Sequence, residues 1–393
     1  MGKFKGIVVG SLLVAGGLCQ GAFGAKATII TMPSITKWTI TVSGFPPGEV
    51  PATGAGISLA TLNSTIAASF QTAVDTLNNT LGKFQNQKKL AEGFGNANAY
   101  SAQSATLQGY QNYGLFAVTA GGMLGVQAPS IDPAYFAKIG GEITTNPDIF
   151  AGIGASFPTV NVGVNLKFLV PGLYANAKFG TFHLDFGDST SKLILDNMCI
   201  GLGANYALVK EMPLGPLHWR GVSVGSGILY QKNSVGLTLK VAPVIQKVPL
   251  QANSALSTDT VSIVLSPLLK LGIASNTVTV PVDVTTSVCL LWFLNLNAGI
   301  GFDFNFGGTD IIVNGSSTVN MTQEPSSNAG SVMEFGSGNF EIDGSTKGVA
   351  PSVADFRLMT GLGLNIAMVK LDIPIIYYVT TGLSIGATVG VVF

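Results

Sequence analysis

The stretch that most constrains this chain is its last one, residues 381–393, which reads TGLSIGATVGVVF. From Gly382 on, apolar side chains occupy the odd positions, and glycine, serine or threonine occupy the even positions, with Val392 as the exception. A period of two places successive side chains on opposite faces of a β-strand. The stretch therefore predicts a strand with one apolar face and one small, polar face, a pattern that a soluble sandwich strand would share.

The same alternation recurs in two further stretches, 159–168 (TVNVGVNLKF) and 294–308 (LNLNAGIGFDFNFGG). In both, large apolar residues share one parity, while polar residues and glycine share the other. An uncharged apolar face suits lipid, whereas the opposite face suits a hydrated lumen. We therefore expect the following side chains to face a lumen: Asn161, Asn165, Lys167, Asn295, Asn297, Asp303 and Asn305.

The composition supports a sheet embedded in a membrane. The chain has 393 residues, of which 47% are hydrophobic but only 10% are charged, whereas soluble domains carry about 25% charged residues. A closed β-barrel leaves no backbone group unpaired in lipid. At roughly 20 residues per strand and turn, with about 9 to 11 residues per strand in the membrane, residues 113–393 predict an all-β transmembrane fold. We expect an antiparallel outer-membrane β-barrel of about 14 strands.

The carboxyl terminus adds a resemblance. Strands that end on a phenylalanine resemble the terminal strands of bacterial outer-membrane β-barrels, whose last residue is read by the barrel-assembly machinery. This resemblance implies that Phe393 is a terminal assembly signal. It also implies two partners, the barrel-assembly machinery and outer-membrane lipid.

The amino terminus has the features of an export signal. Two lysines precede the apolar run 7–18, and Ala22-Phe23-Gly24 is a small-residue cleavage site, which predicts a secretory signal peptide over residues 1–24. The alternative is lipidation at Cys19, which Leu18 disfavours because a small residue normally stands before the lipidated cysteine. Since no later apolar run is long enough for a transmembrane helix, we expect a location in the bacterial outer membrane.

The segment 25–112 precedes the predicted barrel and follows a different period. Apolar residues recur every three or four positions between 57 and 90, which predicts an amphipathic helix, either inside the lumen or outside the barrel. The stretch 93–112 is small and polar, which is typical of a coil. We expect 25–112 to combine an extended segment, this helix and a hatch, and 113–393 to form the barrel.

Finer features are expected within the barrel. In 173–187 the apolar residues change parity near Gly180, which predicts a β-bulge. The acidic, Ser- and Gly-rich stretch 323–353 has the weakest pattern and is expected to include an extracellular loop. Aromatic residues at candidate strand ends are expected either in girdles at the lipid headgroups or as ordinary strand residues: Trp219, Trp292, Phe293, Tyr377 and Tyr378.

Catalytic and metal-binding patterns are weak. Residues 221–225 (GVSVG) match the G-x-S-x-G nucleophile elbow, but the elbow needs a strand-to-helix turn, and here the strand alternation continues. His183 and His218 lack a second His or Cys at zinc-ligand spacing. Cys199 and Cys289 lie in alternating stretches and are interpreted as unpaired thiols. We expect no enzymatic activity, no cofactor and no metal.

The charge pattern also limits the possible functions. The formal net charge is zero, so no basic surface argues for binding to nucleic acid. Arg220 and Arg357 are the only arginines, so the sequence hardly provides the charged constriction of a general porin. Lys167, Lys178 and Lys270 are expected either to contribute to such a constriction or to be simply solvated.

A small-residue hatch runs straight into a strand over residues 93–127 (GFGNANAYSAQSATLQGYQNYGLFAVTAGGMLGVQ). Together with the terminal strand, this layout resembles the long-chain fatty acid transporter (FadL-type) family of outer-membrane barrels, in particular its divergent spirochaete-like versions. The resemblance implies about 14 strands, an N-terminal hatch and a hydrophobic ligand such as a long-chain fatty acid. The family's Asn-Pro-Ala hatch element is absent, with 96–99 (NANA) nearest to it, so no individual binding residue carries over.

We expect the exit path to run between Phe94 and Tyr113, with Tyr100, Tyr110 and Tyr113 offering ring faces; simple packing of the plug is the alternative. The sequence thus predicts uptake of hydrophobic small molecules through a plugged barrel. Two other classes stay open, a general diffusion porin and a secreted or surface adhesin built from strands. No pattern indicates the oligomeric state.

Overall fold

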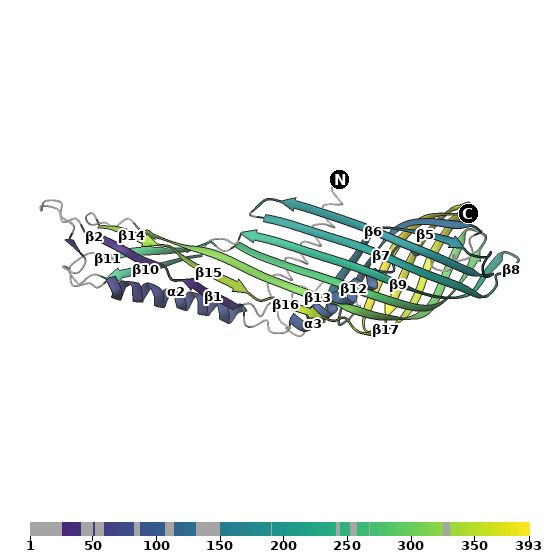
Figure 1. The fold of residues 1–393 in the computed structure, drawn as a ribbon, viewed down its shortest axis with the longest axis horizontal. Helices are drawn as coiled ribbons and strands as arrows, with labels where there is room; N and C mark the ends of the chain where they lie inside the picture. The colour runs from purple at the N-terminus through teal and green to yellow at the C-terminus, as the bar shows by residue number, and fades with distance from the viewer. Residues whose placement is uncertain are drawn as a thin grey trace.

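The computed structural model describes residues 26–40, 50–51, 59–81, 87–106, 114–130, 150–189, 191–240, 244–251, 258–266, 268–324 and 331–393. The predicted signal peptide and Cys19 lie outside these residues. The molecule is elongated, with a β-barrel at one end and a long sheet accompanied by a helix at the other (Figure 1). We call this second part the arm.

Ten of the described strands close into an antiparallel ring. In ring order they are β13 (Leu294–Gln323), β12 (Leu268–Leu290), β9 (Leu217–Lys240), β7 (Ser191–Val209), β6 (Leu173–Gly187), β5 (Gly152–Asn165), β4 (Phe116–Gln127), β19 (Gly382–Val392), β18 (Val369–Tyr378) and β17 (Ala354–Ile366). The ring closes because β13 pairs with β12 on one edge and with β17 on the other. The terminal strand β19 pairs with β4, the first strand of the ring.

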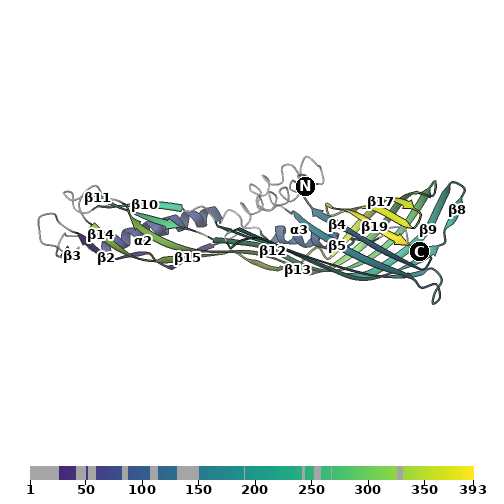
Figure 2. The same cartoon turned by 90° about the horizontal axis from the view of Figure 1, so that it is seen from above.

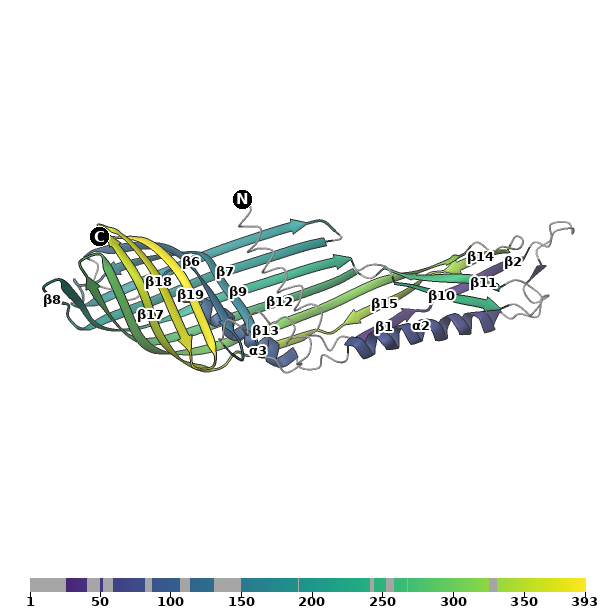
Figure 3. The same ribbon diagram turned by 180° about the vertical axis from the view of Figure 1, so that it is seen from behind.

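The ring has fewer strands than the expected 14 or so, because several strands are far longer than a membrane requires. β9, β12 and β13 contain 24, 23 and 30 residues, whereas about 9 to 11 residues cross a bilayer. The additional length of these strands continues into the arm (Figure 3).

The outward face of the barrel is apolar and the inward face is polar. Along β13, Phe302, Phe304 and Phe306 are 49%, 41% and 54% exposed, while Asp303 and Asn305 between them are each 1% exposed. Other strands of the ring carry the same apolar band, which includes Val160, Val162, Val164, Leu358, Leu362, Leu364, Ile385 and Val389. Such a band over a closed antiparallel sheet is the arrangement of a transmembrane β-barrel.

Beyond Gly307 the two faces of β13 exchange character. The outward positions become polar and exposed, as at Asn314 and Ser316. The inward positions become apolar and buried, as at Ile311 and Val313. The pairing of β13 with β12 continues through this point without a register shift, so the exchange lies in the sequence and not in a bulge. At about 3.3 Å per residue, the rest of β13 extends about 50 Å beyond the apolar band.

The same exchange explains β6, where the expected bulge at Gly180 is absent. β6 pairs with β7 from Leu173 to Gly187 without a shift, whereas its pairing with β5 ends at Phe179. Beyond Phe179 the strand belongs to the arm, so its apolar side chains lie on the face that continues the lumen. The sequence pattern therefore changed parity without any insertion in the strand.

The arm adds short strands to the edge of β13. They are β1 (Lys26–Thr31), β10 (Val244–Gln251), β11 (Thr258–Leu265), β15 (Gly338–Asp343) and β16 (Thr346–Val349), and a separate small sheet contains β2 (Ser34–Ile40), β3 (Val50–Pro51) and β14 (Ser331–Gly336). The stretch 323–353, expected to include a loop, thus holds three strands among its described residues. At the opposite end of the molecule, β8 (Met212–Leu214) pairs with β9.

The expected helix over 57–90 is two helices, α2 (Leu59–Leu81) and α3 (Gln87–Ser101). Helix α2 lies along the arm, and α3 lies in the barrel (Figure 2). Since α3 continues to Ser101, part of the stretch expected as coil is helical. Among the described helices, none has the length and hydropathy needed to cross a membrane.

Candidate functional site

Helix α3 fills the lumen where the barrel joins the arm. Its second half consists of small and polar residues, and Asn96, Ala97, Asn98, Ala99 and Tyr100 are each at most 1% exposed. Asparagine and glycine are poor helix formers in water. Inside the barrel their short side chains fit the narrow space and find partners on the wall, so tertiary contacts override their low propensity.

Asn98 is the central attachment of this plug. Its amide nitrogen donates to the backbone oxygen of Gln231 at 3.0 Å and to Thr277 Oγ1 at 2.9 Å, and its Oδ1 accepts from Asn233 Nδ2 at 2.5 Å. These partners lie on β9 and β12. One side chain therefore fastens the helix to two adjacent wall strands.

Asn96 and Tyr100 attach the plug to the opposite part of the wall. Asn96 Oδ1 accepts from the backbone nitrogen of Ser352 at 2.7 Å. The Tyr100 hydroxyl donates to Gln127 Oε1 at 2.9 Å and lies 2.9 Å from Thr380 Oγ1. The wall thus holds the plug on both sides.

Lys178 fastens the end of the plug. The side chain is 4% exposed, and its Nζ donates to the backbone oxygens of Ala102 at 3.2 Å and Ser104 at 2.9 Å, and to Thr106 Oγ1 at 2.8 Å. A cation suits this position because carbonyl groups at the end of a helix lack partners and carry partial negative charge.

Glycines in β5 let the helix backbone approach the wall directly. A Cβ at Gly152 would overlap the carbonyl oxygen of Gly93, and a Cβ at Gly154 would overlap that of Ala97. Any larger residue at these two positions therefore displaces the plug.

A buried charged cluster lies below the plug. Arg357 is 1% exposed, and its guanidinium lies 3.0 Å from Asp283 Oδ2 and 3.2 Å from Asp303 Oδ1. Asp355 accepts hydrogen bonds from Thr380 at 2.8 Å and from Asn305 at 2.9 Å. Because Thr380 also contacts the Tyr100 hydroxyl, hydrogen bonds connect Asp355 to the plug.

The structure places most of the residues singled out by the sequence inside the barrel. Phe94 and Tyr100 are buried in the plug, and four of the expected lumen residues are at most 4% exposed: Asn295, Asn297, Asp303 and Asn305. Asn161 is 8% exposed, and Asn165 is half-buried at the end of β5. Tyr110 and Tyr113 lie outside the described residues.

One expectation about the lumen-facing residues is wrong. Lys167 is exposed in the turn after β5, because the strand ends at Asn165, and so it does not face the lumen. Tyr378 is the last residue of β18, so of the two alternatives it is a strand residue and not part of a girdle. It is fully buried and its ring stacks on Tyr100 with centroids 3.7 Å apart. By contrast, Trp292 is 81% exposed in the turn after β12.

Above the plug, the lumen face continues as an apolar surface of the arm. Two rows of paired side chains cross it from β6 to β13: Leu184, Leu195, Val235, Ile273 and Ile311 in one row, and Phe186, Leu193, Leu237, Leu271 and Val313 in the next. Ile311 is fully buried, whereas Phe186 at the far edge is 73% exposed. An apolar surface therefore leads from an accessible edge to the plug. We call these two rows the apolar rows.

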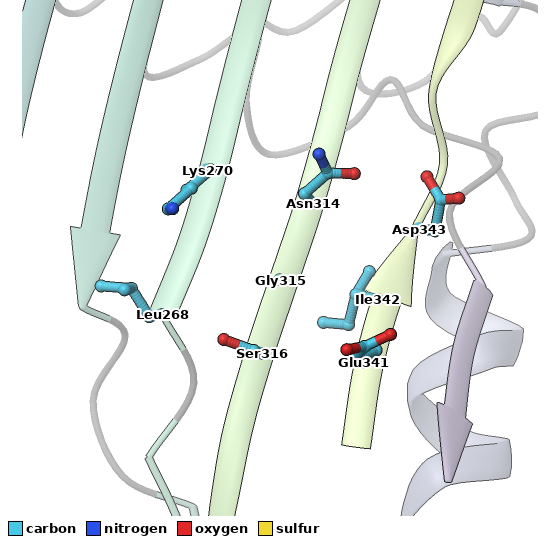
Figure 4. A pocket seen from close by; sticks show the side chains of 8 residues that line it. All are labelled: Leu268, Lys270, Asn314, Gly315, Ser316, Glu341, Ile342 and Asp343. Atoms are coloured by element: carbon cyan, nitrogen blue, oxygen red, sulfur yellow. The ribbon is translucent and has the colours of Figure 1, made fainter. Parts of the chain in front are cut away.

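A polar cavity of about 340 Å³ lies on the opposite, outward face of the arm. Lys270 and Leu268 stand on one side of it, Glu341 and Asp343 on the other, and Asn314 between them (Figure 4). Lys270 is thus remote from the lumen, unlike Lys178.

The candidate catalytic and metal-binding residues form no recognisable centre. Ser223 lies within β9, with its hydroxyl 3.0 Å from Thr285 Oγ1, and His218 Nε2 lies 3.1 Å from Glu211. Cys199 and Cys289 are buried free thiols. In the part of the chain that the structure describes, no three His, Cys, Asp or Glu residues are grouped to hold a metal ion.

Sequence comparison identifies a family. A family model described as Lsa36-like matches residues 40–393. None of the curated proteins matches the chain.

Several solved β-barrel structures match this chain at low sequence identity. The translocator domain of the autotransporter NalP from Neisseria meningitidis is 8% identical, covering 72% of this chain and 90% of its own, with a TM-score of 0.27. The toluene transporter TodX from P. putida is 7% identical, with coverages of 77% and 99% and a TM-score of 0.25. A Pseudomonas aeruginosa FadL homologue is 8% identical, with coverages of 77% and 98% and a TM-score of 0.24.

Proposed function

We propose that this chain, which belongs to the Lsa36-like family, is an outer-membrane transporter that takes up hydrophobic small molecules through its plugged barrel, and is not an enzyme. The observation that carries the proposal is the pair of apolar rows, which lead directly to the plug. Long-chain fatty acids are the ligands we propose first. Residues 1–24 would serve as the export signal, and 25–112 and 113–393 as the plug-bearing segment and the barrel.

We propose an orientation from the connections at one end of the barrel. Short turns join β5 to β6, β12 to β13 and β17 to β18 at one end of the barrel, and the chain end at Phe393 lies at the same end. The arm lies at the other end. Since outer-membrane barrels have short periplasmic turns and longer extracellular connections, we assign the arm to the outside.

Transport in this scheme has three steps. A hydrophobic molecule binds to the apolar rows because burial of apolar surface releases water, at about 25 cal/mol per Å². It then moves to the barrel mouth. Release inward requires the plug to rearrange, because α3 and its side chains occupy the lumen. Tyr100 and Phe94 would line this path, as would Tyr110 and Tyr113.

Ligand displacement tests the proposal. Detergent-purified protein should bind a fluorescent fatty-acid analogue, and oleate should displace it. Phe186→Asp places a carboxylate on the apolar rows and should weaken binding at least tenfold. The matched control, Ser316→Asp, adds the same charge to the outward face of the arm and should bind like the wild type. Equal binding by both variants would contradict the role of the apolar rows.

Other outcomes would support the competing functions. Strong ionic conductance of the wild type in planar bilayers without any fatty-acid binding would favour a porin. A mature chain that stays in solution without detergent would favour a secreted adhesin. Loss of a hydrolytic activity in Ser223→Ala would indicate a hydrolase, whereas this substitution should not affect transport.

We also propose that Phe393 is read by the barrel-assembly machinery. Its ring stacks on Phe116 with centroids 4.5 Å apart, and its backbone exchanges hydrogen bonds with residues at the start of β4. Deletion of Phe393 should reduce the amount of heat-modifiable, membrane-inserted protein in cells. Unchanged insertion would exclude this role for Phe393.

A further inference from the structure

The helix on the arm is attached through two asparagine side chains. Asn63 accepts from the backbone nitrogen of Ile35 at 2.7 Å and donates to its oxygen at 3.0 Å. Asn78 accepts from the backbone nitrogen of Ala27 at 2.6 Å and donates to its oxygen at 3.0 Å. The two amides thus fasten α2 near both of its ends, one to β2 and the other to β1.

The same helix covers the apolar surface of the arm. Ile66, Phe70 and Val74 are at most 3% exposed, and the ring of Phe70 packs edge-on against Phe340 of β15 with centroids 6.4 Å apart. This contact belongs to one continuous apolar core along the inner face of β13. The helix therefore covers the part of this core that lies next to β1, β2 and β15, and the apolar rows continue from the same core.

The plug helix shares this core. Leu90, Ala91 and Phe94, in the first half of α3, are buried in the same apolar cluster as Ile66 and Phe70 of α2. The apolar rows lie between the two helices, with Leu193 and Ile273 packed against the cluster while still partly exposed. A molecule that enters the apolar rows thus meets side chains that hold both helices.

The two helices are also close along the chain. Leu81 ends α2 and Gln87 begins α3. At about 3.3 to 3.6 Å per residue, the chain between these residues spans roughly 20 Å at most. A displacement of α2 that exceeds this reach must pull on α3.

We propose that α2 regulates the plug: docked on the arm it keeps α3 in the barrel, and its displacement by an apolar molecule releases α3. This inference rests on the proposed function for its ligand, whereas the coupling between the helices is independent of what is transported. Helix α2 is thus a cover that senses occupancy of the arm, and the shared core and the short connection transmit its movement.

Hydrogen exchange measured by mass spectrometry on the full chain in lipid nanodiscs tests the coupling. In the double variant Asn63→Ala and Asn78→Ala, amides of both 59–81 and 87–101 should exchange at least tenfold faster than in the wild type. Faster exchange in α2 alone would overturn the inference. Gln71→Ala removes an exposed contact to Asp75 on the outer side of α2 and should leave both helices protected.

A second variant is needed if the double asparagine substitution does not detach α2 from the arm. Phe70→Asp puts a carboxylate into the contact with Phe340 and should undock the helix because a buried charge is strongly unfavourable. The plug should again exchange faster, and ionic current through planar bilayers should rise at least tenfold. An undocked α2 with a protected plug and unchanged current would overturn the inference.

The ligand is tested separately with 1-dodecanol as an uncharged apolar probe. Its addition to the wild type should speed exchange in both helices. Faster exchange in α2 without any change in α3 would overturn the inference. If coupling holds in the variants but neither oleate nor 1-dodecanol binds, the transport proposal fails and the coupling stands.

Discussion

Asparagine side chains fasten both helices to strands, although one helix lies in the barrel and the other on the arm. Asn98 does so for α3, and Asn63 and Asn78 do so for α2. An amide offers a donor and an acceptor at once, so a single short side chain can hold a helix against backbone groups. Replacing it leaves those groups without partners.

For the plug, we predict that Asn98→Ala lowers the free energy of unfolding by about 1 to 3 kcal/mol, because buried donors and acceptors lose a partner. Ionic current should rise as well. Thermal unfolding, followed by heat-modifiable gel migration, and planar-bilayer recordings measure the two effects. Asn320→Ala, at an exposed position of β13, is the control. Indistinguishable behaviour of the two variants would show that Asn98 does not hold the plug.

On the arm, hydrogen bonds from Lys247 and Ser262 lower the pKa of Glu324. A carboxylate with a lowered pKa stabilises the folded state above its unfolded pKa of about 4.3, and this contribution is lost as the pH falls through the folded value. After correction for the pH dependence of the intrinsic exchange rate, the amides of 244–251 and 258–265 should therefore lose protection between pH 7 and pH 3.

This loss of protection should be smaller in Glu324→Gln, which lacks the ionised contact at every pH. Glu341→Gln, an exposed change on β15 of the same arm, should keep the wild-type pH profile. If Glu324→Gln also keeps it, another group causes the acid sensitivity.

At the scale of elements, the fit between α3 and β5 depends on the absence of side chains on the wall. We predict that Gly154→Val prevents the plug from seating, because its side chain would occupy the position of the helix backbone at Ala97. Protease digestion of residues 87–106 should become at least tenfold faster.

The matched control is Gly236→Ala in β9, where a Cβ meets Ile194 at an ordinary 3.8 Å. This variant should be digested like the wild type. Equal digestion of Gly154→Val and the wild type would mean that the plug tolerates a larger wall residue.

The strands were largely predictable from the sequence. Alternation placed a strand over 173–187, and β6 spans Leu173–Gly187. The strand number was not predictable, because the period of two continues from barrel to arm and only the parity of the apolar residues changes. Nothing in β13 marks where the membrane ends except the exchange of polar and apolar parity after Gly307, which becomes clear only once the barrel is known.

The attachments of the plug were less predictable than its location. Tyr100 and Phe94 were singled out by their rings, but Asn96 and Asn98 were not. Their partners, such as Thr277 and Ser352, lie more than a hundred residues further along the chain. Contacts between residues so far apart in the chain form only when the ring closes, and local sequence patterns do not predict which residues closure brings together. The NANA stretch itself was the available signal.

At the scale of the whole molecule, β13 contributes to the apolar band of the barrel and to the polar outer face of the arm. The two regions should therefore differ in the side chains that they tolerate. We predict that Phe302→Arg destabilises the barrel by about 2 to 4 kcal/mol, because the charge faces the hydrocarbon core. Folding into liposomes under increasing urea measures this loss.

Ser316→Arg provides a control on the same strand and the same face, beyond the exchange of character. Since this position lies outside the apolar band, the folding free energy should change by less than about 0.5 kcal/mol. Equal losses in both variants would contradict the assigned boundary of the membrane.

The position of α2 in the chain has a consequence for biogenesis. Residues 59–81 precede every strand of the ring. This helix therefore emerges from the ribosome and from any export channel after β1 and β2, but before β15, which its Phe70 contacts. Exposed apolar sheets aggregate while they fold. A helix that is synthesised before β13 and β15 can shield the apolar face of the arm while that face forms. A circular permutant that moves the helix to the carboxyl end would lose this protection.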